Sequence, residues 1–293
     1  MLRRMARACV GAGAVALGLA CGPDLENQSQ LLQVRLLGLR ADPPELNVEN
    51  GLPPPIAFTA LVYPDATELT LTLALCGPGD YFSATFACPG ADGLDLPGDI
   101  LDPGSAEVQA FVLSRYGDAG VSALDGGINV GEPGVAQVPI GYLLERNDGG
   151  TDPTDRERGI YRLAVRFSGA PNHNPELLDV RLPDGGPLAG ASLGPNQELR
   201  LTPVIPDGGP GGIETYVGLD GGLQYETLSY SWESTAGEVV DFRSAEPTPQ
   251  APDNTAYIRF RTHEIAGPVR IYVVLRDLRG GTAFKFFDAT LGP

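Results

Sequence analysis

The chain has 293 residues with 37 acidic and 20 basic side chains, so its formal net charge at pH 7 is −17. So large a negative charge repels nucleic acid and anionic lipid head groups, which argues against a polyanion-binding role. The 39 glycines and 27 prolines accompany recurrent clusters of Val, Leu, Ile, Phe and Tyr. This composition favours many short strands joined by tight turns over helices or disorder, and it predicts an all-β fold.

The first 20 residues have the features of a bacterial export signal. Three arginines precede an uncharged run from Ala8 to Ala20, whose 13 residues are too few to cross about 30 Å of hydrocarbon as a helix. Small residues precede Cys21, so ordinary signal cleavage before this cysteine is one interpretation. Removal of residues 1–20 takes away three arginines and no acids, which lowers the formal charge from −17 to −20.

The end of the signal, Leu17-Gly18-Leu19-Ala20-Cys21, resembles the lipobox of bacterial lipoproteins, in which a diacylglycerol-modified cysteine becomes the mature N-terminus. Without the signal three cysteines remain, an odd number for an exported protein, and lipidation of Cys21 would leave the even pair Cys76 and Cys88. The resemblance implies an exported protein that is anchored in the lipid bilayer of the cell envelope through acylated Cys21. Because Gly22 and not Asp follows the cysteine, we expect the outer membrane or the cell surface.

A short polar tether, residues 21–30, leads into a first predicted unit, residues 31–170. Its predicted strands are Val34–Leu46, which Pro43 and Pro44 interrupt, Ala57–Tyr63, Leu69–Leu75 and Tyr161–Phe167. In the third of these, four leucines alternate with Thr and Ala, which predicts one buried face. The segment 77–155 is rich in Gly, Pro and Asp and is expected to be a long irregular insertion. It would contain one short helix, where Val108, Phe111, Val112 and Tyr116 have helical spacing.

The pattern restarts at Pro171-Asn172-His173-Asn174-Pro175, which we expect to be a rigid junction before a second unit, residues 171–293. Predicted strands here are Glu176–Leu182, Glu198–Val204, Leu228–Trp232, Ala256–Phe260, Val269–Leu275 and Ala283–Ala289. Strands at this spacing, with Gly-rich turns and no helical period between them, predict an antiparallel sandwich. Trp232, the single tryptophan, lies within a strand, and a core tryptophan on the third strand is one mark of immunoglobulin-like sandwiches.

Two stretches carry a family resemblance. Leu39-Arg40-Ala41-Asp42-Pro43-Pro44-Glu45 is similar to the opening of a group of surface lipoproteins from myxobacteria and related bacteria. Tyr230-Ser231-Trp232 and the run Gly267–Asp277 resemble extracellular immunoglobulin-like repeats of the polycystic-kidney-disease type. The resemblance implies two tandem immunoglobulin-like antiparallel β-sandwiches after a cleaved signal. It assigns no activity, because this architecture supports adhesion, spacing and glycan binding alike.

Cys76 and Cys88 are twelve positions apart in an exported chain, which predicts a local disulfide at the end of the leucine strand. Loop closure of this length would contribute about 3 kcal/mol or less. Two thiols with no neighbouring histidine do not complete a metal site, and no metal or cofactor is predicted. Asp-Gly-Gly recurs at Asp125, Asp148, Asp184, Asp207 and Asp220 and predicts tight turns, with low-affinity calcium binding by clustered loops as the alternative.

No catalytic residues are predicted. His173 and His263 are the only histidines, and turn or capping roles are expected for both. A choice of paired carboxylates among 37 acids would be arbitrary. The tyrosines at 216, 225, 230, 257 and 272 could line a sugar-binding face, although aromatic residues in alternating strands more often pack in the core.

These observations predict a non-catalytic cell-envelope lipoprotein that acts as a structural or protein-interaction module. Its expected partners are the bilayer and an envelope protein or glycan, and the irregular segment 77–155 is the expected contact surface because recognition residues concentrate on loops. The alternative is a carbohydrate-binding envelope protein or an accessory to a secreted degradative system. A hydrolase is a third and less favoured class, because the chain has only two histidines to act as a catalytic base.

Overall fold

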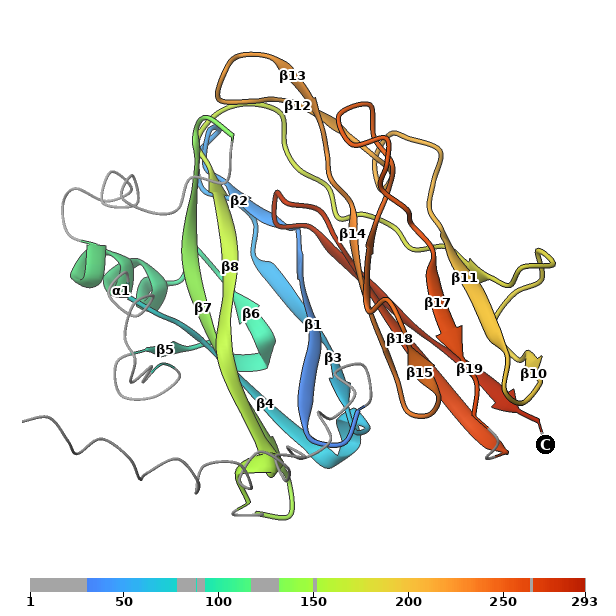
Figure 1. The fold of residues 1–293 in the computed structure, drawn as a ribbon. Helices are drawn as coiled ribbons and strands as arrows, with labels where there is room; N and C mark the ends of the chain where they lie inside the picture. Colours follow the sequence, from blue (N-terminus) through green and yellow to red (C-terminus); the bar gives the residue numbers. More distant parts are fainter. Residues whose placement is uncertain are drawn as a thin grey trace, which may run out of the picture.

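The structure is a computed structural model that describes residues 31–77, 88, 93–116, 132–149, 152–263 and 266–292. The predicted signal, Cys21 and the predicted tether therefore lie outside the described residues. The described chain is built mostly of β-strands, as its composition predicts (Figure 1).

The strands fall into two groups along the chain. The first contains β1 (Arg35–Asp42), β2 (Glu45–Asn47), β3 (Ile56–Tyr63), β4 (Leu69–Leu75), β5 (Leu94–Asp95), β6 (Ile100–Leu101), β7 (Val135–Arg146) and β8 (Arg156–Arg166). The second contains β9 (Asp179–Arg181), β10 (Ser192–Leu193), β11 (Glu198–Val204), β12 (Thr215–Val217), β13 (Leu223–Tyr225), β14 (Ser229–Ser234), β15 (Glu238–Val239), β16 (Arg243–Ala245), β17 (Ile258–Arg261), β18 (Gly267–Arg276) and β19 (Thr282–Leu291). The helices are α1 (Ala106–Tyr116) and the short 3₁₀ turns η1 (Ala66–Glu68), η3 (Pro97–Asp99) and η5 (Pro153–Asp155).

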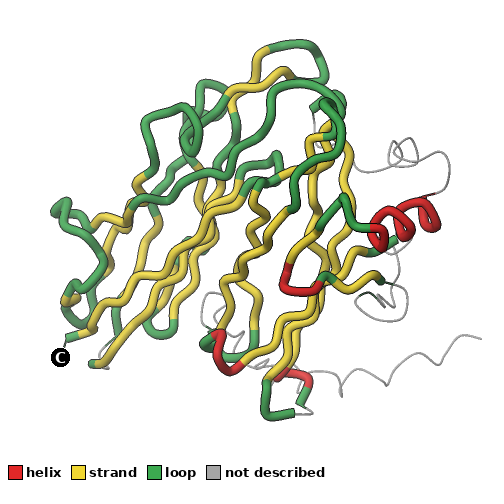
Figure 2. Tube along the Cα trace, turned by 180° about the vertical axis from the view of Figure 1, so that it is seen from behind, coloured by secondary structure: helices red, strands yellow, loops and turns green. Residues whose placement is uncertain are grey.

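Each group folds into a sandwich of two sheets. In the first sandwich the sheets have the orders β1-β3-β6 and β2-β8-β7-β4-β5. In the second they have the orders β15-β17-β11-β9 and β10-β19-β18-β14-β16, and the separate hairpin β12–β13 joins β11 to β14. The two sandwiches lie side by side, and α1 covers the outer side of the first (Figure 2).

The two sandwiches repeat one topology. In both, the second strand runs parallel to the last strand, as β2 does to β8 and β10 to β19, while the remaining neighbours pair in the antiparallel sense. The order matches the two sheets of immunoglobulin-like sandwiches. The prediction of all-β sandwiches is therefore correct.

Alternation of apolar residues explains the two cores. Leu73 and Leu75 of β4 are only 1% and 2% exposed, as the alternating leucines predict. In the second sandwich, Trp232 of β14 is fully buried and pairs in register with Val273 of β18. The indole nitrogen of Trp232 donates to Ser244 Oγ at 3.0 Å, so the polar atom of this buried ring is satisfied.

The prediction that residues 77–155 form an irregular insertion is wrong for β7 and for the short strands β5 and β6. The segment contains β5, β6, α1 and β7, and β7 is a central strand that pairs with both β4 and β8. Pro139 and Gly141 interrupt the alternation of apolar and polar residues in β7. The sequence pattern therefore did not predict a strand there. Gly141 has a packing reason, because a Cβ atom there would lie 2.7 Å from Cys76 Sγ and 2.8 Å from Cys88 O.

The predicted short helix is confirmed as α1. Ser105 precedes it and its hydroxyl accepts a hydrogen bond from Val108 N at 3.2 Å, which caps the first turn. Val108 packs in the core of the first sandwich, and Phe111 packs against that core. No helix in the described part of the chain has the length and apolar character needed to span a membrane.

The sandwiches meet through β1 on one side and β18 and β19 on the other. Between them is an apolar cluster that includes Leu37, Leu61 and Val274. Gly38 permits this close approach, because a Cβ atom at that position would lie 3.1 Å from the ring of Phe284. The register of β1 shifts between Leu36 and Gly38, so Leu37 is displaced from the β1–β3 pairing and packs at the junction.

Candidate functional site at the junction of the two sandwiches

The residues singled out in the sequence do not converge on one site. Cys76 and Cys88 form the predicted disulfide beside β7, with their Cα atoms 5.9 Å apart. Trp232 lies in the core of the second sandwich. Cys21 lies outside the described residues, so the structure gives it no surroundings.

The predicted turns and histidines have ordinary structural roles. Asp184 and Asp220 each accept a hydrogen bond from the backbone N–H two residues later, at 2.9 Å, as expected for Asp-Gly-Gly turns, whereas Asp125 lies outside the described residues. His263 is exposed, and His173 Nδ1 lies 2.8 Å from Glu214 Oε1. Within the described ranges no group of three or more His, Cys, Asp or Glu side chains is arranged to hold a metal ion.

The five tyrosines do not form a common sugar-binding face. Tyr230 is 1% exposed in the core of the second sandwich, and Tyr272 is 5% exposed at the junction. Tyr216 and Tyr225 are offset by one position in the β12–β13 register, so they point to opposite faces of that hairpin. The core-packing interpretation is therefore correct for Tyr230.

The most unusual feature of the described molecule is a buried row of alternating acids and arginines across the junction. Arg166 Nε donates to Glu45 at 2.7 and 2.9 Å, and its terminal nitrogens donate to Glu132 at 2.6 and 3.1 Å. Arg279, from the turn between β18 and β19, donates to the same Glu132 at 2.9 Å and to Glu226 at 2.7 Å. Glu132 thus links an arginine of the first sandwich to one of the second.

The connecting segment after β8 completes this network. Asn172 N donates to Glu45 Oε1 at 2.9 Å, and Asn172 Nδ2 donates to Asp277 Oδ2 at 3.1 Å. Asn174 donates to the carbonyl of Ala41 at 2.7 Å and accepts from Thr282 N at 2.9 Å. Asn172 and Asn174 therefore tie β1 and β2 to the β18–β19 turn, and their amides satisfy backbone and carboxylate groups distant in sequence.

Acids outnumber bases in this network. Glu45, Glu132, Glu226, Glu214 and Asp277 surround only two guanidinium groups. Burial, reinforced by the charge of Asp277, raises the pKa of Glu226 to about 7 although Arg279 hydrogen-bonds to it. Burial alone would raise the pKa of Glu132, but hydrogen bonds from Arg166 and Arg279 outweigh it and lower that pKa. Glu132 is therefore the ionised bridge, while Glu226 exchanges its proton near neutral pH.

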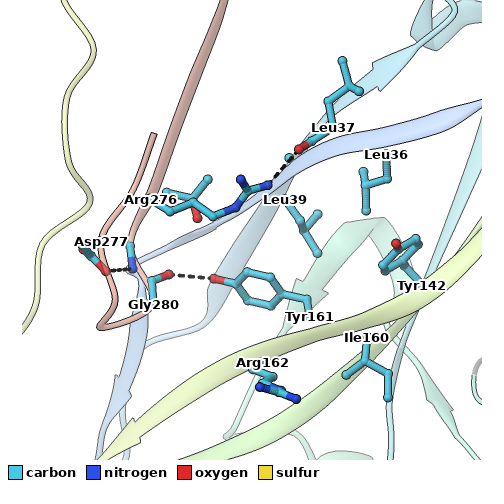
Figure 3. A pocket seen from close by; sticks show the side chains of 13 residues that line it. Leu36, Leu37, Leu39, Tyr142, Ile160, Tyr161, Arg162, Arg276, Asp277 and Gly280 are labelled. Atoms are coloured by element: carbon cyan, nitrogen blue, oxygen red, sulfur yellow. Dashed lines mark hydrogen bonds between the residues drawn. The ribbon is translucent and has the colours of Figure 1, made fainter. Parts of the chain in front are cut away.

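A cleft of about 440 Å³ opens beside this network, between β1, β8 and the β18–β19 turn (Figure 3). Its apolar lining includes Leu36, Leu39 and Ile160. Tyr161 also lines it and donates its phenol hydrogen to the carbonyl of Gly280 at 3.0 Å. Arg276 supplies a guanidinium group to the wall.

Side chains cover the outer edge of β1 along the junction. Leu36 N donates to the carboxylate of Glu157, and the carbonyl of Leu37 accepts from Arg276 Nη2 at 2.9 Å. Asn174 caps the carbonyl of Ala41 farther along the strand. These contacts take the place of a neighbouring strand, so this edge of β1 is protected against pairing with another chain.

Sequence reasoning missed the charged junction. Arg166 belongs to the predicted strand Tyr161–Phe167, where its alternation with apolar residues gave no sign of a buried ion pair. Its partners Glu45 and Glu132 are 121 and 34 positions away, and no local pattern marks them. The usable signal was the polar run Asn172-His173-Asn174 between two prolines, from which a junction between two units was predicted.

Comparison with known proteins gives no family. No protein-family model and no curated protein match the chain. Similar solved structures include the fibronectin(III)-like modules of Clostridium thermocellum CbhA, at 12% identity and TM-score 0.22, covering 87% of this chain and 93% of that one. The C-terminal domain of the Streptococcus agalactiae AgI/II polypeptide BspA matches at 10% identity and TM-score 0.21, covering 89% and 81%. Mouse cadherin-23 EC22–24 matches at 11% identity and TM-score 0.20, covering 87% and 63%.

At these identities and TM-scores the likeness assigns no function. The strand order of the chain itself defines its class. The protein is an all-β protein whose described strands form two sandwiches of immunoglobulin-like topology.

Proposed function

We propose that the chain is a non-catalytic lipoprotein of the bacterial cell envelope, anchored through acylated Cys21, that acts as a structural or protein-interaction module. In this proposal residues 31–170 and 171–293 are two immunoglobulin-like domains held together as one body. The buried row from Glu45 to Glu226 supports the idea of one body, because its ion pairs join the two sandwiches directly.

The observation that carries the proposal is the position of Leu31, the first described residue, relative to the two sandwiches. Leu31 N donates to the carbonyl of Ser234 at 3.1 Å, and the Leu31 side chain is buried in the apolar cluster of the junction. The first described residue is thus held between the two sandwiches beside Ser234, the last residue of β14, whereas the β12–β13 hairpin precedes the other end of β14 (Figure 1). An anchor on the segment before Leu31 would hold this end near the bilayer and direct the hairpin away from it.

The end directed away from the bilayer carries exposed apolar side chains. Val217, Leu219 and Leu223 of the β12–β13 hairpin are 54%, 58% and 63% exposed. Val217 and Leu223 form a cross-strand pair on one face of the hairpin. Clustered apolar exposure on a protein surface is typical of contact sites, so the hairpin, in place of the segment 77–155 expected from the sequence, is the contact surface that we propose for a partner in the envelope.

The anchor is tested by metabolic labelling of cells with an alkyne-bearing fatty acid. We expect the native protein to incorporate the label and to sediment with membranes, and Cys21→Ala to lose both properties because no thiol is available for acylation. Cys9→Ala is the matched control, since it removes another cysteine of the predicted signal and should leave labelling unchanged. Equal labelling of the native and Cys21→Ala proteins would contradict the proposed anchor.

A further inference from the structure

We propose that the cleft between β1, β8 and the β18–β19 turn binds a small organic anion with an apolar body and one carboxylate, which Arg276 receives. The inference goes beyond the proposed module function and does not depend on the lipid anchor. It rests on the chemistry of the cleft lining (Figure 3).

Arg276 carries a positive charge that no neighbour neutralises directly. Its terminal nitrogens donate to the carbonyl of Leu37 at 2.9 Å and to Ser231 Oγ at 3.1 Å, and both acceptors are neutral. Among the described residues, no carboxylate lies within salt-bridge distance of its guanidinium group. Burial accordingly lowers the pKa of Arg276, although the charge of Glu233 opposes this effect. A guanidinium group has five N–H donors, so donors remain for a bound carboxylate.

The one acid in the lining does not supply the missing partner. Asp277 lines the cleft, but its Oδ1 accepts from Arg279 N at 2.8 Å and Gly281 N at 2.7 Å. Its Oδ2 accepts from Asn172 Nδ2 at 3.1 Å. The carboxylate of Asp277 is therefore occupied by hydrogen bonds from the β18–β19 turn and from Asn172. The cleft thus presents a positive charge, although the protein as a whole is strongly acidic.

The aliphatic and aromatic part of the lining supplies a surface for an apolar body. Leu36, Leu39 and Ile160 supply aliphatic surface. The phenol of Tyr161 is engaged with Gly280 O, and that of Tyr142 donates to Glu157 Oε1 at 3.3 Å. Arg162 and Thr282 are the other polar side chains of the lining. The volume of about 440 Å³ lies within the usual range for small-molecule sites.

The test is calorimetric titration of the full chain with hexanoate and with its neutral analogue hexanamide. We expect hexanoate to bind at least about tenfold more tightly, because a hydrogen bond from a guanidinium group to a carboxylate is stronger than one to a neutral amide oxygen. Equal affinities, or no heat from hexanoate at about 10 mM, would overturn the proposal. Binding of galacturonate in place of hexanoate would also overturn it, since that result would require a polar body.

Arg276→Gln is the matching variant, and we expect it to weaken hexanoate binding at least about tenfold. Arg200→Gln is the control, because Arg200 is exposed over the ring of Tyr257, outside the cleft lining, and its replacement makes the same change of charge. Unchanged binding by folded Arg276→Gln would overturn the proposal. If this variant fails to fold, the hexanoate and hexanamide comparison on the native protein decides the question.

Discussion

Replacement of Arg279 by alanine is expected to lower the free energy of unfolding by about 3–5 kcal/mol, the usual cost of breaking a buried ion pair. Arg279 is only 3% exposed and bridges Glu132 to Glu226. Its removal leaves both carboxylates buried without this donor. Urea unfolding at pH 7 measures the change.

Arg259→Ala is the matched control for this experiment. Arg259 forms a comparable two-contact pair with Asp241, at 2.8 and 3.1 Å, but its side chain is 46% exposed. We expect that variant to lose less than about 1 kcal/mol, because water screens exposed pairs. Equal losses in the two variants would show that the junction row does not behave as a buried network.

A second expectation concerns pH. The free energy of unfolding should fall as the pH rises from about 5 to about 8. Burial raises the pKa of Glu226 to about 7 in the folded protein, above its ordinary value of 4.5. A carboxyl group with a raised pKa binds its proton more tightly when folded, so its contribution is present below its ordinary pKa and is lost as the pH rises through 7. Burial also raises the pKa of Glu233 to about 7, beside Arg35.

The groups around Glu226 explain why its ionisation is costly. Arg279 donates to one of its oxygens at 2.7 Å and Glu214 N donates to the other at 3.3 Å, while the charges of Asp277 and Glu214 oppose a further negative charge. Glu226→Gln keeps an acceptor for Arg279 and removes the titration. We therefore expect this variant to lose less stability between pH 5 and pH 8 than the native protein, and the double variant with Glu233→Gln to lose less still.

Unfolding profiles in urea at several pH values test this expectation. Glu198→Gln is the control, since its side chain is 42% exposed. A native profile that is flat or rises between about pH 5 and pH 8 would contradict the assignment. The same conclusion would follow if Glu226→Gln declined as steeply as the native protein.

The sequence predicted most of the long strands because alternation is a local signal. Leu69–Leu75 and Val269–Leu275 alternate over several residues, and the structure contains them as β4 and part of β18. β7 was missed because Pro139 and Gly141 interrupt its alternation and are residue types typical of loops. The two-residue strands β5, β6 and β10 are too short to have a pattern of their own.

The candidate site could be predicted from the sequence less well than the fold. The disulfide could be predicted because exported cysteines pair and only two remained after Cys21 was assigned. The junction row could not, because Arg166 and Arg279 look like ordinary surface arginines until their partners, up to 147 positions away, are brought beside them. The cleft likewise depends on Leu37 and Arg276, which only the packing of the two sandwiches brings together.

The most direct test of the proposed function is site-specific photo-crosslinking in living cells. A photoreactive residue at Leu223, on the exposed hairpin, is compared with one at Leu52, which is similarly exposed in the first sandwich at 67%. We expect one reproducible envelope protein to crosslink from Leu223 and not from Leu52. Identical products from both positions, or none from Leu223, would contradict an interaction module that presents this hairpin to a partner.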